Sequence, residues 1–321
     1  MKKAVKRISI VLLSVLAICA LFVLVSYVNH RIQLAKEDAL FKQIGTSVEV
    51  NGHMMNVYSE GSGETTLVFM SGGGTCSPVL DFKSLYSQLS DTYKIAVVEK
   101  AGYGFSEITD SSRDIDTVLS ETRQALKLAN IDGPYVLCPH SMSGIEALYW
   151  AQQYPEEVKA IIGLDMAVPQ AYEDYKINMP LIRLGAFAAN TGITRWFSGL
   201  AESDAVKYGT LTDDEKALYK VIFYRRTATT DMLNEVQQIK TSAQKVADGG
   251  IPNVPILIFS SNGEGTGWDE QAWRDFQSEY INACQNGTLI KLECSHYVHD
   301  IEYKKITLDI RQYLSTLESA E

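Results

Sequence analysis

The sequence contains few of the residues that commonly bind metals or form disulfide bonds. Its 321 residues include five histidines and five cysteines, and no Cys-x-x-Cys or Cys/His spacing is typical of a zinc site. Cys284 and Cys294 flank an Asn-Gly turn, and they could pair only in an oxidising compartment. Nothing else in the sequence implies a metal or an organic cofactor, so we predict neither.

Positive charge is also scarce. The chain has 29 Lys and Arg against 39 Asp and Glu, which gives a formal net charge of −10. The first 29 residues hold four basic residues and no acid, so the remainder carries −14. Because nucleic acids and anionic lipid surfaces attract basic proteins, this balance argues against both as partners of the domain.

Residues 8–28 lack any charge or proline. A helix of this length spans a hydrocarbon core of about 30 Å, and the preceding bases Lys2, Lys3, Lys6 and Arg7 favour a cytoplasmic N-terminus. The apolar run is longer than that of most signal peptides and lacks a small-x-small cleavage site at its end. We therefore predict an uncleaved single-pass anchor in the cell membrane. A cleaved signal peptide, or a lipoprotein signal ending at Cys19, is the alternative.

The rest of the chain alternates strand and helix patterns. Residues 30–45 are predicted to form a polar stalk, and the following strands are joined at Asn51-Gly52 by a hairpin turn. The alternation of strands and helices is typical of an α/β protein with a mostly parallel sheet, here of eight strands, and helices on both faces. Further strands are predicted at 66–70, 94–98, from Tyr135, and at 160–164, 255–259 and 288–292.

The alternation stops between about residues 168 and 249, where no strand pattern is visible. This stretch contains helical patterns at 179–189, 213–225 and 230–246. We interpret it as a helical cap inserted into one domain of residues 46–321. Residues 1–29 then form the basic start and the anchor.

A serine lies between a buried strand and a helix. Residues 135–138 form the strand pattern, Pro-His-Ser-Met-Ser-Gly follows at 139–144, and a helix begins there. This string resembles the nucleophile turn of α/β-hydrolases, a variant of their Gly-His-Ser-Met-Gly-Gly. The resemblance makes Ser141 the expected nucleophile. Pro139 and Ser143 replace small glycines of the motif, and Pro139 fits only if its fixed φ suits the end of the strand.

A histidine follows the last predicted strand. The string Ser-His-Tyr-Val-His at 295–299 resembles the Gly-His-Tyr-x-His of α/β-hydrolases, with Ser295 in place of glycine. A serine nucleophile needs a base within hydrogen-bond reach, and the resemblance makes His296 that base. His299 is the rival. The side chain of His140, next to the serine, is expected to point away from it.

The acid that orients the histidine has two candidates. The Gly-x-x-Asp of related families aligns with Ser261-Asn262-Gly263-Glu264, which favours Glu264. Asp165 directly follows the preceding strand and is the alternative, and Asp269 is a third possibility.

Backbone amides are expected to stabilise the oxyanion. The resemblance assigns this role to the amide of Met142 and to the glycine loop 72–74, with Gly73 first and Gly74 second. The segment 99–106 resembles the Asp-x-x-Gly-x-Gly-x-Ser turn of the same superfamily, with a structural role.

Together, the motifs predict a membrane-anchored serine hydrolase whose domain lies outside the cytoplasm. Its substrate is expected to be a small ester or amide, such as an N-terminal aminoacyl bond, cleaved through an acyl-enzyme. A catalytically silent binding protein and an acyltransferase are the alternatives. The serine argues against epoxide hydrolases and haloalkane dehalogenases, which use aspartate at that position. The motifs leave the substrate and the oligomeric state open.

Overall fold

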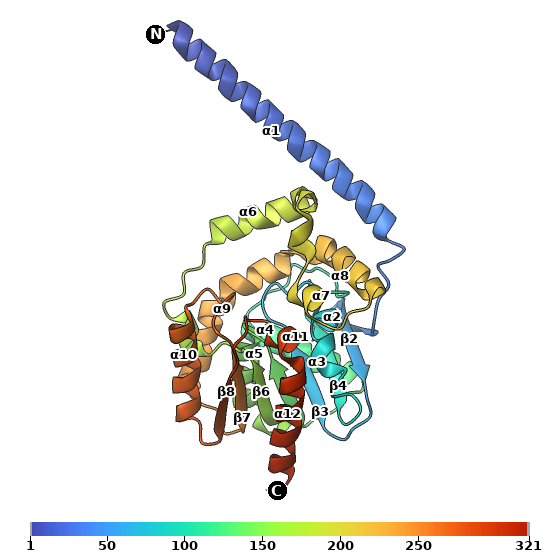
Figure 1. Cartoon of the computed structure of the whole chain (residues 1–321), viewed down its shortest axis with the longest axis vertical. Helices are drawn as coiled ribbons and strands as arrows, with labels where there is room; N and C mark the ends of the chain where they lie inside the picture. Colours follow the sequence, from blue (N-terminus) through green and yellow to red (C-terminus); the bar gives the residue numbers. More distant parts are fainter. Residues whose placement is uncertain (1, 320–321) are drawn as a thin grey trace.

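The computed structural model describes residues 2–319 and contains one eight-stranded sheet (Figure 1). The strands are β1 (Thr46–Val50), β2 (His53–Glu60), β3 (Thr66–Met70), β4 (Lys94–Glu99), β5 (Tyr135–Pro139), β6 (Val158–Leu164), β7 (Ile256–Ser260) and β8 (Gly287–Lys291). They lie in the order β1-β2-β4-β3-β5-β6-β7-β8. The pairs β1–β2 and β2–β4 are antiparallel, and all other neighbours are parallel. The predicted mostly parallel sheet is thereby confirmed.

The predicted hairpin between the first two strands is also present. Asn51 and Gly52 connect β1 to β2 with φ of 52° and 85°. Two consecutive positive φ angles match the turn that Asn-Gly sequences favour, because its twist agrees with that of the strands.

Helices cover both faces of the sheet. On one face, α4 (Ile115–Leu128), α5 (Ser143–Gln153) and α10 (Glu270–Ala283) bury apolar side chains in a core that contains Trp150. On the other face, α2 (Pro78–Asp81), α3 (Lys83–Tyr86), α11 (Val298–Ile301) and α12 (Tyr303–Glu318) pack in a core that contains Phe69 and Phe259. The apolar spacing within residues 82–89 and 301–317 predicts one helix in each. In the first only the single turn α3 forms, whereas α12 covers nearly all of the second.

Between β6 and β7 the described chain is helical, with no strand, as the sequence predicts. We call residues 165–255 the helical insertion. Figure 1 shows it above the end of the sheet where the parallel strands finish, with α9 and α8 lying across this end. Its helices are η2 (Pro169–Tyr172), α6 (Met179–Asn190), η3 (Ile193–Trp196), η4 (Ser198–Ala201), α7 (Asp204–Lys207), α8 (Asp213–Arg226) and α9 (Thr230–Asp248).

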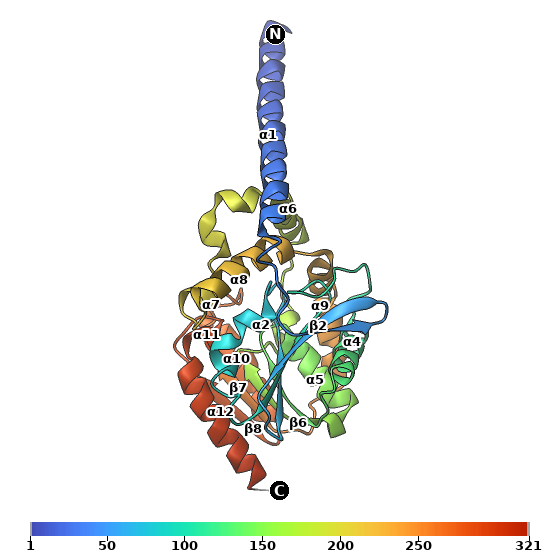
Figure 2. The same ribbon diagram turned by 90° about the vertical axis from the view of Figure 1, so that its right-hand side faces the viewer.

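The N-terminal helix α1 (Lys2–Glu37) projects from the same end of the domain (Figure 2). By length and composition this helix could cross a membrane, and a signal sequence can be as long and as apolar. The apolar run and the polar residues up to Glu37 form one continuous helix, which includes the first part of the predicted stalk at 30–45. Among its described residues only Ser26 and His30 are buried, and both contact the helical insertion.

The disulfide considered for Cys284 and Cys294 does not form, and both cysteines are free. Cys284 ends α10 and packs in the core on one face of the sheet, whereas Cys294 belongs to the core on the opposite face. The sheet therefore separates the two sulfurs, although the residues are close in sequence.

Candidate active site

Ser141 occupies a tight turn between β5 and α5. Its φ of 54° lies in the left-handed region, which a residue with a Cβ adopts only under constraint. The glycine loop after β3 lies directly against this turn: a Cβ added to Gly72 would come within 2.8 Å of the Ser141 Cβ. The strained backbone and the missing side chain of Gly72 leave Ser141 at the wall of a pocket.

The two departures from the glycine pattern fit this turn. Pro139 is the last residue of β5, where its lack of an N–H leaves no central strand bond unmade, because regular pairing with β6 ends at Leu137. Ser143 is buried, and its Oγ donates to the carbonyl oxygen of Met70 at 2.6 Å and lies 2.9 Å from that of His140. Ser143 therefore ties the turn to β3, which a glycine could not do.

His296 lies in the loop between β8 and α11 and points at the serine. Its Nε2 lies 2.8 Å from the Ser141 Oγ, and its Nδ1 lies 2.6 Å from the Asp165 Oδ2. Because a carboxylate only accepts hydrogen bonds, Nδ1 carries the proton and Nε2 is free to accept from the serine hydroxyl. His296 is buried, with 6% of its surface exposed.

Asp165 completes this chain of contacts, so the alternative acid and not the preferred one faces His296. It directly follows β6 with φ of 52° and is fully buried. Its Oδ1 accepts from the Ser261 N–H (2.8 Å), Trp273 Nε1 (2.8 Å) and Gln277 Nε2 (3.3 Å). Every partner of the carboxylate is thus a hydrogen-bond donor.

Glu264, the acid favoured by the sequence, is exposed, and its carboxylate has no partner among the described residues. It lies in a loop where Gly263, Gly265 and Gly267 all have positive φ. The backbone of this loop lies against the base: a Cβ on Gly265 would come within 3.2 Å of the His296 Cβ, and the Glu264 carbonyl accepts from the His296 N–H at 3.0 Å. Glu264 therefore contacts His296 only through its main chain. Asp269, the third candidate, caps α10 instead.

The other two candidate histidines lie behind His296. The ring centroids of His140 and His296 are 4.5 Å apart, and His140 Nε2 donates to the His296 carbonyl at 3.2 Å. Burial, followed by the neighbouring His296 and His299, lowers the pKa of His140 well below its ordinary value, so the ring stays neutral. His140 supports the loop that carries His296, whereas His299 is fully buried and lies 3.3 Å from the Asp81 carboxylate.

Within residues 2–319, one group of side chains has ligand atoms close enough to hold a metal ion. Asp81, His299 and Asp300 are fully buried, and their ligand atoms lie within 4.8 Å of one another. Burial, then the charges of Asp81 and Asp204, raises the pKa of Asp300 far above its ordinary value, which favours a protonated carboxyl there. None of the three side chains lines the pocket at Ser141.

The expected oxyanion donors differ from one another. Neither the Met142 nor the Gly73 amide donates to another described residue, and both residues line the pocket. A Cβ on Gly73 would come within 2.9 Å of the Met142 side chain, so the two residues are close neighbours at the pocket. The Gly74 amide instead donates to the Tyr103 hydroxyl at 3.4 Å. Gly73 and Met142 are therefore better placed than Gly74.

The turn at 99–106 contacts the glycine loop through Tyr103, whose hydroxyl accepts from the Gly74 amide. Glu99 is fully buried and accepts from the Phe105 N–H (2.7 Å) and from Asn56 Nδ2 (3.0 Å). Its carboxylate fills the space beside Gly104, where a Cβ would come within 2.0 Å of it. Burial raises the pKa of Glu99 to about 7.

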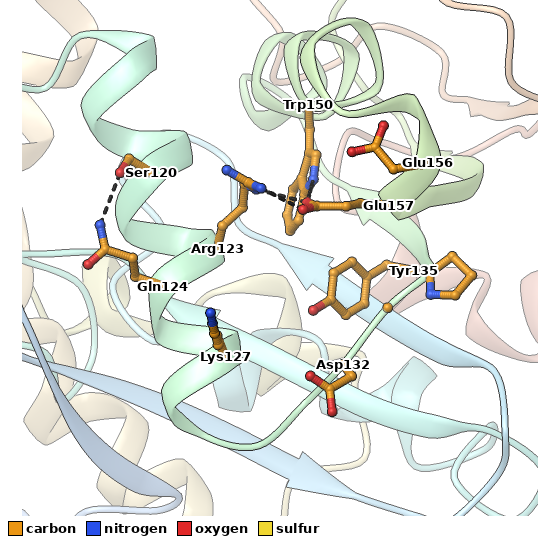
Figure 3. A pocket seen from close by; sticks show the side chains of 11 residues that line it. Ser120, Arg123, Gln124, Lys127, Asp132, Tyr135, Trp150, Glu156 and Glu157 are labelled. Carbon is orange, nitrogen blue, oxygen red and sulfur yellow. Dashed lines mark hydrogen bonds and ion pairs between the residues drawn. The ribbon is translucent and has the colours of Figure 1, made fainter.

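The pocket at Ser141 has a volume of about 430 Å³ and runs between the sheet and the helical insertion. Leu181 and Ile182 of α6, Val236 and Ile239 of α9, and Trp268 give it mostly apolar walls. A larger hollow of about 580 Å³ lies elsewhere, between α4 and the start of β5 (Figure 3).

The larger hollow has the character of a structural crevice. Its Arg123 binds Glu157 through Nε at 2.8 Å, and Trp150 donates to the same carboxylate at 2.8 Å. Figure 3 shows these side chains directed at one another, with no serine–histidine pair among the residues that line the hollow. The smaller pocket, which contains Ser141 and His296, is therefore the candidate site.

No protein-family model matches the chain. The chain is 43% identical over 266 residues to the uncharacterized protein YbdG of Bacillus subtilis (strain 168). The aligned region covers 81% of this chain and 82% of YbdG. This chain belongs to the YbdG family. Identity at this level over four fifths of both proteins implies that the members of the YbdG family share one fold.

Solved structures identify that fold. Haloalkane dehalogenase DbeA from Bradyrhizobium elkani matches with a TM-score of 0.68 and 15% identity over 86% of this chain and 99% of its own. Cfl2 from Burkholderia cenocepacia matches with a TM-score of 0.68 and 17% identity over 83% of this chain and 94% of its own. This YbdG-family chain therefore has the α/β-hydrolase fold that the motifs predict.

Trp273 and Gln277 are the site residues that sequence reasoning missed. Both lie on α10 and donate to the Asp165 carboxylate. No motif surrounds them, and their spacing of four residues on a helix facing the core is equally typical of ordinary packing. Only the placement of α10 against β7 and β8 reveals the contact.

Proposed function

We propose that this protein is a serine hydrolase that cleaves a carboxylic ester or small amide through an acyl-enzyme. One observation carries the proposal: His296 lies between Ser141 and Asp165, 2.8 Å from the serine Oγ and 2.6 Å from the aspartate Oδ2. Ser141 and His296 line an apolar pocket. The order of contacts supports a nucleophile, a base and an acid that orients the base.

In the proposed reaction the Ser141 Oγ attacks the substrate carbonyl carbon while His296 Nε2 takes the hydroxyl proton. Asp165 stabilises the imidazolium and keeps its ring oriented through Nδ1. His296 then gives the proton to the leaving alcohol or amine, and the acyl group remains on Ser141. Water attacks this ester with His296 again as the base, which releases the acid and restores the serine.

The developing oxyanion would be bound by the amides of Met142 and Gly73. The Met142 amide lies at the N-terminal end of α5, where unpaired N–H groups and the helix dipole favour negative charge. Neither amide donates to another described residue, which supports this role.

The nucleophile separates this proposal from the reaction of the dehalogenase relative. Haloalkane dehalogenases use an aspartate at the position of Ser141. Displacement of a halide by a serine hydroxyl would give an ether, which water does not hydrolyse as it hydrolyses an aspartyl ester. The complete set of contacts around His296 also favours catalysis over a silent binding role. Transfer of the acyl group to an acceptor other than water would use the same residues.

We also propose that α1 anchors the protein in the cell membrane as a single-pass helix, with the hydrolase domain outside the cytoplasm. The apolar residues 8–28 and the four preceding bases support this arrangement. The division into residues 1–29, 30–45 and 46–321, with a cap at about 168–249, stays a prediction.

Labelling with a fluorophosphonate tests the proposed chemistry, because this reagent forms a covalent bond only with an activated serine. The full chain in detergent should be labelled at one site, and Ser141→Ala should abolish labelling. Wild-type protein that stays unlabelled and inactive on p-nitrophenyl esters would favour the silent binding role.

A further inference from the structure

Six large apolar side chains are exposed on one stretch of the helical insertion. They are Leu181, Leu184, Phe187, Trp196, Phe197 and Leu200, each between 49% and 62% exposed. We call them the α6–η4 surface. Outside this stretch and α1, the exposed large apolar side chains of the described chain are scattered, so the cluster is unusual for a surface that only water covers.

Three of the six side chains form one face of a helix. Leu181, Leu184 and Phe187 recur every three residues along α6, which places them on the same side. Figure 1 shows α6 at the outer end of the domain and inclined to α1. The three side chains are about half exposed, so α1 does not cover this face. A helix with one exposed apolar face is typical of segments that lie in a membrane interface.

Contacts with α1 fix the depth of this surface relative to the proposed membrane span. The Trp196 Nε1 donates to the Ser26 Oγ at 2.9 Å, and the rings of Trp196 and Phe22 lie 5.9 Å apart. Both partners belong to the apolar run 8–28. At 1.5 Å per residue, Phe22 lies about 9 Å inside the end of that run at Val28.

The length of the apolar run 8–28 restricts where Trp196 can lie relative to the bilayer. Residues 8–28 extend over about 31 Å as a helix, close to the hydrocarbon thickness of about 30 Å. A bilayer that encloses this run must reach Phe22, and therefore the neighbouring Trp196. Tryptophan is also the residue most enriched, together with tyrosine, at the level where hydrocarbon meets headgroups.

The local charge fits the same surface. Residues 175–201 contain Lys176, Arg183 and Arg195 but no Asp or Glu, although the chain carries −10 overall. Arg195 is paired with Glu37 of α1, whereas Arg183 is exposed between Leu181 and Leu184. This segment therefore carries a net positive charge although the domain is acidic, and a long basic side chain can reach lipid phosphates.

The pocket adjoins this surface. Leu181 belongs to the α6–η4 surface and also lines the pocket, together with its neighbour Ile182. An apolar chain entering beside α6 would pass between this helix and Ile239 of α9 toward Ser141.

We propose that the α6–η4 surface rests in the interface of the bilayer that holds α1, and that the pocket takes its substrate from that bilayer. The substrate class is then a long-chain acyl ester resident in the membrane. This inference rests on the proposed function and on the proposed anchor, and the first experiment below does not depend on activity.

Quenching of tryptophan fluorescence by brominated lipid tests the docking directly. The chain has four tryptophans, of which Trp150 and Trp273 are buried and Trp196 is 54% exposed. In phosphatidylcholine vesicles brominated on the first half of the acyl chains, the full chain should be quenched, and Trp196→Phe should lose about half of that quenching or more. Trp268→Phe, in the pocket, is the matched control and should keep most of it.

Quenching that is absent in the wild type, or unchanged in Trp196→Phe, would overturn the docked surface. A chain that stays out of the vesicles would overturn the anchor as well. Strong Trp196-dependent quenching in a protein without hydrolase activity would support the membrane contact of the α6–η4 surface. The same result would contradict the proposed reaction and its substrate class.

Paired substrates test the substrate class. p-Nitrophenyl palmitate dissolved in vesicles and p-nitrophenyl acetate in solution share one leaving group and differ in where they reside. The double variant Leu184→Glu/Phe187→Glu should lose about tenfold or more on the palmitate and stay within about twofold on the acetate, because neither residue lines the pocket. Leu128→Glu/Leu308→Glu, exposed on α4 and α12, is the control and should affect neither. Equal losses on both substrates, or no loss on the palmitate, would overturn the substrate class.

Discussion

The side chains at the Ser141 end of the sheet are buried and hydrogen-bonded, whereas those of the α6–η4 surface are exposed to solvent. Asp165 is fully buried, and donors from the 261 loop, α10 and His296 surround its carboxylate. The α6–η4 surface instead leaves six large apolar side chains about half exposed. The first region is complete within the chain, whereas the second gains apolar burial only from something outside it.

This difference separates two kinds of change. In the buried region, removing one partner leaves a charged or polar group unsatisfied, so the geometry of His296 is lost. On the exposed surface, a polar substitution costs the isolated domain little, and its effect depends on the environment. Variants of the first region should therefore act on the reaction, and those of the second on membrane contact.

The largest effect is expected from Ser141→Ala. Loss of the nucleophile should lower kcat/KM for p-nitrophenyl acetate by about 1,000-fold or more, while the urea midpoint of unfolding stays near that of the wild type. The measurement is steady-state hydrolysis by the full chain in detergent. Retention of more than about a hundredth of the wild-type rate would remove Ser141 from the reaction.

The next effect distinguishes the two acids. Asp165→Asn should lower kcat by about 100-fold or more, because an amide cannot hold His296 in the same tautomer. Glu264→Gln should stay within about twofold, because only the main chain of Glu264 contacts His296.

Both acid variants need a check of folding by circular dichroism, since Asp165 is buried. A larger loss in Glu264→Gln than in Asp165→Asn, in equally folded protein, would reverse the assignment of the acid.

A smaller effect concerns the buried turn behind the glycine loop. Burial raises the pKa of Glu99 from 4.5 to about 7, so the folded chain holds this proton more tightly than the unfolded chain. The resulting stability is complete below pH 4.5 and is lost as the pH rises to about 7, by about 3 kcal/mol at most. Glu99→Gln cannot ionise and should flatten this part of the pH dependence.

Urea unfolding of the full chain in detergent at pH 4.5 to 7.5 measures this change. Glu49→Gln, exposed on β1, is the matched control and should leave the wild-type pH dependence in place. A Glu99→Gln curve parallel to the wild-type curve would contradict the shifted proton.

The smallest effect is expected where α1 meets the helical insertion. Arg195 donates to His30 Nδ1 (2.8 Å) and to both oxygens of Glu37 (2.7 and 2.8 Å). Arg195→Met should therefore speed amide hydrogen exchange several-fold in η3 and η4, with little change around Asp165. Arg183→Met, exposed on α6, serves as the control. Faster exchange around Asp165 as well would show that the two regions are not independent.

Much of the fold and part of the site could be predicted from local patterns. The hairpin at Asn51-Gly52, the strand–Ser–helix turn and the histidine after the last strand depend on residues adjacent in the chain. The ends of short helices were less accurate, as in α2 and α3, because single turns gain their stability from packing and not from their own sequence.

The acid shows where the local pattern fails. The loop 261–264 aligns with a family motif, but three glycines with positive φ direct its backbone against His296 and leave the Glu264 side chain in water. Asp165 has no comparable motif. Its position follows from the sheet order, which puts β6 next to the serine strand β5.

The sequence by itself determined the class of sheet, the apolar length of α1 and the identity of Ser141 and His296 as candidates, since each is a pattern of neighbouring residues. The tertiary structure alone decided which acid faces His296, because the donors Ser261 and Trp273 lie about a hundred residues beyond Asp165 in the chain. It also decided that Trp196 lies beside Phe22, far away in sequence. Contacts of this range depend on how elements pack, and no local pattern encodes them.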